Sequence, residues 1–258
     1  MPYFDTHAHV ASKQLREKLP DVLKSAHFAG VEKILSISAD LQELRETQSL
    51  DVSKSRVEVS FSFGLHPYSA KQLSEISEKM LDDLFSRKEF ISVGEVGLDY
   101  YRGIAPKEEQ RKTFKYFLDY AASRNLPVCV HCRGAYEDVV KMLKTHSVDK
   151  SSVIMHCFSG TKNHALELED MGCYISFAGN ITFPKSEDIR SAAVSLKDTT
   201  ILTETDCPYL SPQWKRGKIN EPSNVAGITD YIAELRGENK TTFAERVYLN
   251  ANKAFGLK

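Results

Sequence analysis

Long apolar segments are absent from this sequence. No stretch of the 258 residues approaches the roughly 18 consecutive apolar residues that a membrane helix requires. The chain also does not begin with the basic and then apolar region that directs secretion. We therefore expect a protein that has no membrane partner and is located in the cytoplasm.

An excess of charge of either sign is absent as well. The sequence contains 34 Lys and Arg against 35 Asp and Glu, which gives a formal net charge of -1. Without a strong overall field, the molecule would hold an anionic substrate only locally, through a metal ion or a few basic side chains. This balance argues against a protein that binds nucleic acid by bulk charge.

Paired cysteine motifs are also absent. The number of cysteines is odd, and no pair of CxxC motifs is present to build a structural zinc site. We expect free thiols in a reducing compartment. The cysteines are Cys129, Cys132, Cys157, Cys173 and Cys207.

A glycine-rich phosphate turn after the first strand, which a doubly wound open sheet usually carries, is missing too. Short β-rich runs instead alternate with polar, helix-like segments along the whole chain. Eight such units predict an α/β protein with a closed (β/α)8 TIM barrel; the open sheet is the alternative. The predicted strands lie near Tyr3 to His7, Glu32 to Ser38, Val57 to Phe63, Phe90 to Glu95, Pro127 to His131, Ser152 to His156, Cys173 to Phe177 and Thr200 to Glu204.

Residues 1–258 are expected to form one domain, because no repeat, low-complexity tract or linker divides them. Glu108 to Arg124 has the three- and four-residue apolar spacing of a core-facing helix. Asn224 to Arg236 and Thr242 to Ala254 are predicted to be two closing helices. The longest irregular stretch, Cys207 to Glu221, follows the eighth strand, and loops of that length are usually functional or mobile.

The first predicted strand ends in an alternating pattern of ligand-type side chains, Asp5, His7 and His9. Alternate side chains of a strand share a face, so these three can converge on one point. On its own, such a pattern is more often two ordinary histidines. It becomes informative only if other parts of the chain supply partners.

Further ligand-type side chains occur at the ends of other predicted strands. The carboxyl ends of all barrel strands open at one mouth, where catalytic groups come from several strands. A lone histidine in such a place is usually an ordinary hydrogen-bonding residue, but repetition at equivalent places argues for a shared metal site. The candidate metal ligands are His7, His9, Glu95, His131, His156 and Asp206.

Four imidazoles and two carboxylates exceed the three or four protein ligands of a single zinc ion. They suit two neighbouring divalent ions bridged by a carboxylate, for which Glu95 is the natural candidate. Mixed nitrogen and oxygen ligation accommodates zinc or manganese and, less comfortably, magnesium. The identity of the metal stays open.

Two such ions predict metal-assisted hydrolysis, in which one ion activates a water and both clamp an oxyanion. Asp206 lies at a strand end across from the two first histidines and is the candidate for the base that takes the water's remaining proton. The predicted catalytic residues are therefore Asp206 and Glu95. The alternative for Asp206 is a structural role, capping the loop before Pro208.

Seven motifs carry a resemblance to a known family: DTHAHV, GLHP, VGEVGLDYY, VHCRGA, MHCFSG, ETDCPYLSP and RGKxNEP. Their types and order resemble the TatD family of metal-dependent deoxyribonucleases, in the amidohydrolase superfamily, over essentially the whole chain. The resemblance implies a (β/α)8 barrel and DNA cleavage with divalent metals, commonly as a 3′→5′ exonuclease. It also implies that the same six residues are metal ligands, with Glu95 in place of the carboxylated lysine of many amidohydrolases.

Two positions depart from the pattern of that family. Tyr68 stands where a second histidine often follows GLHP, and Gly134 stands where an acidic residue is common. His66 and Arg133 are the candidate substrate-binding residues, because both can donate hydrogen bonds to a phosphate at the mouth. Their alternatives are a turn-forming role for His66 and a solvated helix start for Arg133.

The substrate is expected to be DNA, with RNA or tRNA as alternatives, and the oligomeric state is left open. Lys215 to Lys218 can meet a nucleic-acid backbone, or simply be solvated, and Trp214, Tyr209 and Tyr101 can stack on bases. Rival functions on the same metals include removal of a misplaced amino acid from D-aminoacyl-tRNA. A noncatalytic nucleic-acid-binding scaffold is the rival from another class.

Two expectations concern the surroundings of the site. Cys132, Cys157 and Cys207 each directly follow a proposed ligand, so strand alternation predicts that their thiols point outward against the helices. Asp5 is expected to orient an imidazole or the bound water rather than to bind metal directly.

Overall fold

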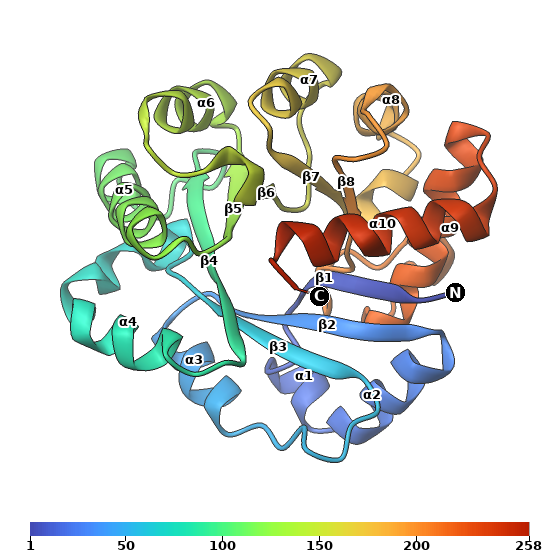
Figure 1. The fold of residues 1–258 in the computed structure, drawn as a ribbon, viewed down its shortest axis with the longest axis horizontal. Coiled ribbons are helices and arrows are strands. Elements are labelled where there is room, and N and C mark those ends of the chain that lie inside the picture. The colour runs from blue at the N-terminus through green and yellow to red at the C-terminus, as the bar shows by residue number, and fades with distance from the viewer. Residues whose placement is uncertain (258) are drawn as a thin grey trace.

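The computed structural model describes residues 1–257, which form one sheet of eight parallel strands in the order β1 to β8. Helices surround the sheet (Figure 1). This consecutive order confirms the predicted (β/α)8 barrel and differs from that of a doubly wound sheet. The strands are β1 (Tyr3–Ala8), β2 (Val31–Ser38), β3 (Glu58–Phe63), β4 (Phe90–Asp99), β5 (Val128–Arg133), β6 (Val153–Met155), β7 (Tyr174–Phe177) and β8 (Ile201–Thr203).

The α-helices cover the outside of the barrel. The helix predicted from Glu108 is α5 and turns its Phe114 and Phe117 into the core, where both are fully buried. The two predicted closing helices are α9 and α10. The α-helices are α1 (Lys13–Arg16), α2 (Leu19–Phe28), α3 (Leu41–Gln48), α4 (Glu78–Phe85), α5 (Lys107–Arg124), α6 (Tyr136–Thr145), α7 (Lys162–Asp170), α8 (Glu187–Ser195), α9 (Val225–Arg236) and α10 (Lys240–Ala254).

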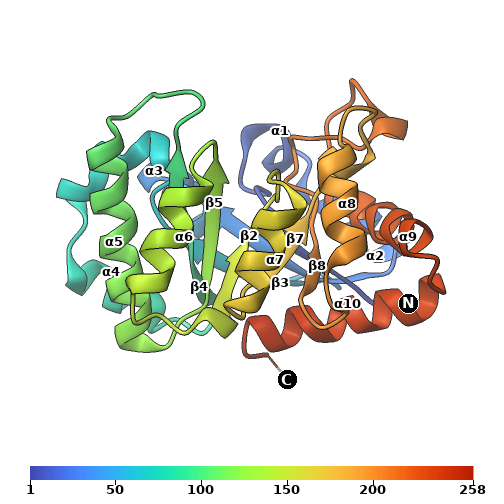
Figure 2. The same cartoon turned by 90° about the horizontal axis from the view of Figure 1, so that it is seen from above.

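One end of the barrel is closed by α10. This helix lies across the end at which the strands begin, and the arrowheads of the strands point away from it (Figure 2). Phe255 packs on Phe4 of β1 with ring centroids 5.7 Å apart, and Ala251 and Ala254 join the same apolar cluster. The opposite end, where the strands finish, therefore stays accessible.

The seam between the first and last strands is held by few contacts. Ala8 and Cys207 form an isolated parallel bridge. The backbone N–H of Asp206 donates to the carbonyl of His7 at 2.9 Å, and the N–H of His9 donates to the carbonyl of Cys207 at 2.7 Å. The ladder that closes the barrel thus runs through the residues predicted to bind metal.

Strand β4 is longer than predicted. It continues past Glu95 to Asp99, and its register against β5 shifts between Val93 and Val96. Two glycines flank Glu95 in this region, and Gly97 has a φ of 141°, where a Cβ atom would collide with the carbonyl oxygen of His131. This close approach of two backbones, which only glycine permits, is not evident in a pattern of apolar residues.

The structure of residues 1–257 bears on membrane-spanning helices and on the state of the cysteines. No helix in this range is both long and apolar enough to cross a bilayer. The five cysteines form no disulfide there and are free thiols, as predicted.

Candidate metal centre

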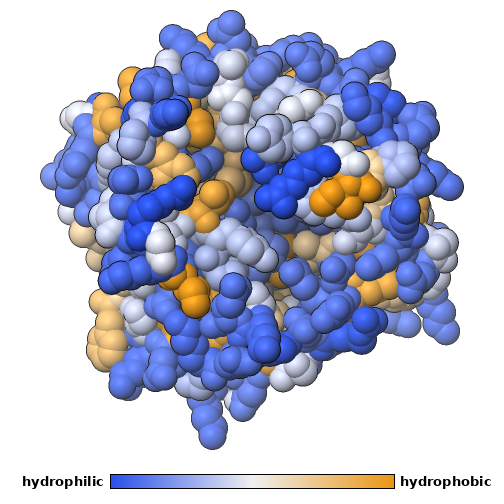
Figure 3. Space-filling view, turned by 180° about the vertical axis from the view of Figure 1, so that it is seen from behind, coloured by the Kyte–Doolittle hydropathy of each residue, from blue (hydrophilic) through white to orange (hydrophobic). Residues whose placement is uncertain are grey.

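The carboxyl ends of the strands open onto the face seen in Figure 3, which is hollowed near its centre. Three overlapping groups of potential metal donors lie at this end, and within each group the ligand atoms are within 4.8 Å of one another. The structure brings all six predicted ligands together and adds a seventh residue, His66. The groups among the described residues are His7, His9 and Glu95; His7, His156 and Asp206; and His66, Glu95 and His131.

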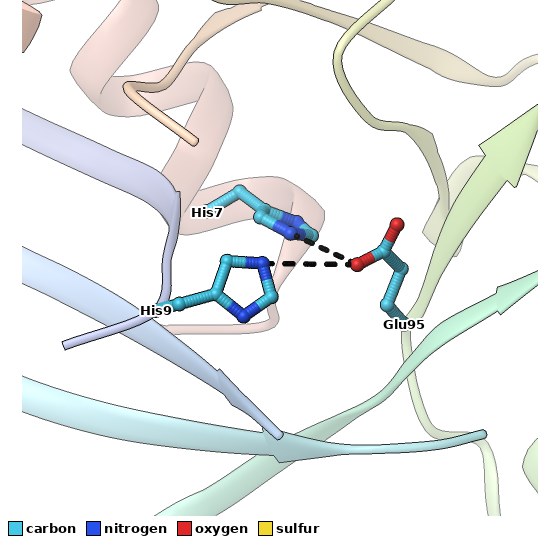
Figure 4. A group of neighbouring side chains, drawn as sticks. All are labelled: His7, His9 and Glu95. Atoms are coloured by element: carbon cyan, nitrogen blue, oxygen red, sulfur yellow. Dashed lines mark ion pairs between the residues drawn. The ribbon is translucent and has the colours of Figure 1, made fainter. Parts of the chain in front are cut away.

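Glu95 lies at the middle of this cluster and is 4% exposed. Its Oε1 is 2.8 Å from His131 Nδ1 and 3.0 Å from His156 Nε2. Its Oε2 is 3.5 Å from His7 Nε2 and 3.8 Å from His9 Nε2 (Figure 4). Each oxygen of this carboxylate thus faces a different pair of imidazoles, which is the arrangement expected of a bridging ligand.

Asp206 completes the side of the cluster that contains the first two histidines. Its Oδ1 is 3.6 Å from His9 Nε2 and 3.9 Å from His7 Nε2. The residue has a φ of 55°, a left-handed conformation that aspartate adopts more readily than most residues. Because its carboxylate points at the imidazoles, the structure does not favour the alternative role as a cap for the following loop.

These donors fit divalent metal ions in chemistry and spacing. Two ligand atoms that each lie about 2.1 Å from one ion are separated by about 3.0 to 3.4 Å. The separations around Glu95 run from 2.8 to 3.8 Å and so include that range. One position would use His131 and His156 with one oxygen of Glu95, and the other would use His7, His9 and Asp206 with the second oxygen.

His66 is better suited to donate a hydrogen bond than to bind metal. Its Nδ1 accepts the backbone N–H of Tyr68 at 3.1 Å, so in the neutral ring the proton is on Nε2. Burial lowers the pKa of His66 to about 4, which keeps the ring neutral near pH 7. Nε2 lies 3.7 Å from Oε1 of Glu95 and presents an N–H to the site. His66 also caps the start of the 3₁₀ helix Pro67–Glu75, so it has the turn-forming role that was its alternative.

The charges of the cluster support one another. Burial alone would raise the pKa of Glu95, but the charge of His156 and hydrogen bonds from His131 and His156 outweigh it and hold the pKa well below its ordinary value. Burial would likewise raise the pKa of Asp206, and nearby imidazoles again lower it. Both carboxylates are therefore ionised at neutral pH, as metal ligands must be.

Three further carboxylates, which we did not predict, contact the outer nitrogens of these histidines. Asp99 lies four residues after Glu95 on β4, Glu204 lies two residues before Asp206, and Glu43 lies on α3. The VGEVGLD and ETD motifs contain the first two, so their position beside a proposed ligand was an available signal. Glu43 carried no such signal, since a carboxylate on a helix is usually solvated.

The structure contradicts the expectation that Asp5 orients an imidazole ring. Its two oxygens accept the backbone N–H of Thr205 at 2.8 Å and the hydroxyl of Thr205 at 2.6 Å, and its closest approach to His7 is to the backbone N–H at 3.5 Å. Within the described residues the carboxylate contacts no imidazole ring and instead holds the segment that carries Asp206. The alternation of β1 directs Asp5 to the neighbouring strand end rather than to a metal.

The thiols follow the predicted outward direction in two of three cases. Cys132 and Cys207 are buried in apolar clusters. Cys157 lies beyond the end of β6 with a φ of 44°, so strand alternation does not apply to it. Burial raises the pKa of its thiol well above the ordinary value, and the negative charge of Asp206 raises it further.

Exposed aromatic and basic side chains surround the mouth. Arg133, at the end of β5, has its guanidinium 4.2 Å from the ring centroid of Tyr101, which is 71% exposed. Tyr209 is half exposed and packs edge-on against His9, with ring centroids 5.8 Å apart. Trp214 is 49% exposed on the loop after β8, where Arg216 is stacked on Phe183 at 4.2 Å.

Comparison with known proteins identifies the family. The sequence profile described as TatD related DNase matches residues 4–256. The chain belongs to the TatD family. This confirms the resemblance carried by its motifs, and the protein is a metal-dependent hydrolase.

Relatives of this TatD-family protein match it along their full length. The "Uncharacterized metal-dependent hydrolase YabD" of Bacillus subtilis (strain 168) is 33% identical over 254 residues, which cover 98% of this chain and 99% of the relative. The "3'-5' ssDNA/RNA exonuclease TatD" of Escherichia coli (strain K12) is 29% identical over 259 residues, with coverage of 98% and 99%. The crystal structure of YJJV, a TatD homologue from Escherichia coli K12, has a TM-score of 0.91 at 26% identity and covers 99% of this chain and 98% of that chain.

Proposed function

We propose that this TatD-family hydrolase is a 3′→5′ exonuclease that removes nucleotides from single-stranded DNA by hydrolysing phosphodiester bonds. The observation that carries the proposal is the position of Glu95, with each carboxylate oxygen facing its own pair of imidazoles. Such a donor set suits two ions spaced to contact one phosphate. The relative that is named an exonuclease for single-stranded DNA and RNA supports the choice of substrate.

The proposed ligands are His7, His9, Glu95, His131, His156 and Asp206. Divalent ions held by them would acidify a bound water and neutralise charge that develops on the phosphate. Asp206 is proposed to accept a proton from the attacking water, because its carboxylate is ionised and reaches the same side of the cluster as His7 and His9. Zinc and manganese fit this mixture of nitrogen and oxygen donors, and magnesium fits it less comfortably because it prefers oxygen ligands.

His66 and Arg133 are proposed to position the phosphate. The Nε2–H of His66 points into the cluster, and its lowered pKa makes it a neutral donor that does not compete with the ions as a second cation. Arg133 supplies a permanent positive charge at the end of the strand that carries His131. Together they would orient the scissile phosphate without a large basic surface, in keeping with the net charge of -1.

The aromatic side chains around the mouth favour a single strand over a duplex. About half or more of the surface of each ring is exposed in Tyr101, Tyr209 and Trp214. Exposed rings stack on unpaired bases irrespective of sequence, whereas bases of a duplex are already stacked on one another. Tyr209 is the nearest of them to the predicted ligands, through its contact with His9.

The test is a cleavage assay on metal-loaded protein with oligonucleotides labelled at either end. A 3′-labelled single strand should release labelled mononucleotide at once, whereas a 5′-labelled strand should give a ladder that shortens with time. EDTA should abolish both. Duplex DNA, RNA and D-aminoacyl-tRNA serve as competing substrates in parallel reactions. Release of amino acid without release of nucleotides would contradict the nuclease proposal, and metal-dependent binding without any cleavage would indicate a noncatalytic scaffold.

A further inference from the structure

We propose that Asp99, Glu204 and Glu43 are positioning residues that select which ring nitrogen each of three histidines offers to metal. The inference rests on the metal centre proposed above. Its consequence is that the two metal positions are tuned separately, one by Asp99 and Glu204 and the other by Glu43. A histidine binds metal through one nitrogen while the other usually donates to an acceptor that fixes the ring.

Asp99 acts on His131. Its Oδ2 lies 3.2 Å from His131 Nε2 and accepts the hydroxyl of Tyr68 at 2.7 Å. Its Oδ1 accepts the backbone N–H groups of Tyr101 and Arg102, both at 3.0 Å. These donors hold the fully buried carboxylate of Asp99 in place. The carboxylate accepts a hydrogen bond from His131 and so keeps the proton of that ring on Nε2. His131 is then left to bind metal through Nδ1, the nitrogen that faces Glu95.

Tyr68 gains a role from this arrangement. It stands where a second histidine often occurs in the family, and here its hydroxyl is one of the donors that anchor Asp99. Its contact is to the carboxylate and not to a predicted ligand. The departure from the family pattern therefore affects Asp99, the carboxylate that supports His131, rather than a proposed metal ligand itself.

Glu204 acts on His156 through the opposite nitrogen. Its Oε1 lies 2.9 Å from His156 Nδ1 and also accepts the backbone N–H of Cys157 at 2.8 Å. The side chain is fully buried. It keeps the proton on Nδ1, so His156 offers Nε2, which is the nitrogen 3.0 Å from Oε1 of Glu95.

Glu43 acts on His9 at the other position. Its Oε2 is 3.4 Å from His9 Nδ1, the longest of the three contacts and the one without hydrogen-bond geometry, and it accepts the backbone N–H of Ala39 at 2.9 Å. His9 then offers Nε2, which faces Oε2 of Glu95 and Oδ1 of Asp206. Glu43 is also the most exposed of the three carboxylates, so its effect should be the smallest.

The first test is calorimetric titration of metal-free protein with Mn²⁺, compared among three single variants. Asp99→Asn supplies an amide that can donate to Nε2 and so favours the wrong tautomer of His131. It should weaken one of two binding steps by about 10- to 100-fold. Glu43→Gln should weaken the other step, toward the lower end of that range. If Asp99→Asn does not fold, Glu204→Gln tests the same position through His156.

Asp138→Asn is the matched control. Asp138 accepts a tyrosine hydroxyl, that of Tyr100 at 2.6 Å, just as Asp99 accepts the hydroxyl of Tyr68. It also pairs with Arg111 at 2.7 Å, but it contacts none of the predicted ligands. It should leave both metal-binding steps unchanged. Wild-type affinities in Asp99→Asn, or a loss of the same step in Asp99→Asn and Glu43→Gln, would overturn separate tuning.

A second measurement reports the tautomers directly. In ¹⁵N-labelled protein loaded with Zn²⁺, long-range proton–nitrogen spectra should show His131 protonated at Nε2 and His156 protonated at Nδ1. Metal binding of His131 through Nε2 would refute the assignment to Asp99. Neither measurement uses nucleic acid, so a protein that meets both expectations yet cleaves no strand contradicts only the proposed nuclease activity.

Discussion

Replacing Asp206 by asparagine should abolish turnover while leaving the fold intact. The amide is nearly the same size, and asparagine tolerates the φ of 55° at this position. The two hydrogen bonds made here by the backbone, to His7 and from Tyr209, do not involve the side chain. The change therefore removes a charge and a proton acceptor from a site 3.6 Å from His9 Nε2 with little other effect.

The loss of a general base costs about 10²- to 10⁴-fold in rate, which corresponds to about 3 to 5 kcal/mol of activation free energy. We expect kcat to fall by at least about 10³-fold, since Asp206 is also a proposed ligand. Steady-state cleavage of a 3′-labelled strand should be measured at several metal concentrations up to saturation, so that weakened metal binding is separated from lost chemistry. The KM for the strand and the melting temperature should change little.

The reasoning fails if Asp206→Asn keeps more than a tenth of the wild-type kcat at saturating metal. It also fails if activity disappears only because the variant is unfolded, which circular dichroism would reveal. Loss of activity that is fully recovered by more metal would reassign Asp206 as a ligand alone.

Three further predictions follow from the site and its surroundings. Burial lowers the pKa of His131, but neighbouring carboxylates raise it more, so the net pKa is raised and protons compete with metal for this ring. The apparent metal affinity should therefore rise from about pH 6 to about pH 8, and calorimetry in matched buffers measures this rise. Gly97→Ala should lower the free energy of unfolding in urea by at least about 2 kcal/mol and disturb metal binding, because the added Cβ would collide with the carbonyl of His131. Gly103 also has a positive φ but faces open space, so Gly103→Ala should lower the free energy of unfolding by less. Tyr209→Ala and Trp214→Ala should each weaken binding of a single strand by about 1 to 3 kcal/mol without a comparable effect on duplex, in fluorescence anisotropy at fixed salt; equal losses on both substrates would contradict a stacking role.

Most of the architecture could be predicted because it depends on local patterns. Each strand of the barrel is a short apolar run, and the eight runs recur with helix-like segments between them, so their order and approximate positions follow from the sequence. The candidate ligands could be expected to lie together for the same reason, since strand ends in a barrel converge, and the structure brings them together. His7 and His9 were visible as an alternating pair at one of those ends.

What could not be predicted depends on contacts between distant segments. Asp99 lies beyond the predicted end of β4, because the strand passes an irregular register between Val93 and Val96 and then continues past Glu95. Asp5 had the correct spacing for the site, but its partner Thr205 is 200 residues away. Which of two plausible neighbours a buried carboxylate contacts is decided by tertiary packing, which periodicity does not contain.

The seam between β1 and β8 makes the candidate metal centre depend on segments that are far apart in the sequence. Asp5 and Thr205 are separated by 200 residues, and the candidate ligands His7 and His9 precede Asp206 by nearly as many. A chain that ends before β8 contains His7 and His9 but lacks the carboxylate of Asp206 that faces them. The candidate metal position that uses His7, His9 and Asp206 is therefore expected to form only once the segment after β8 has paired with β1 across this seam.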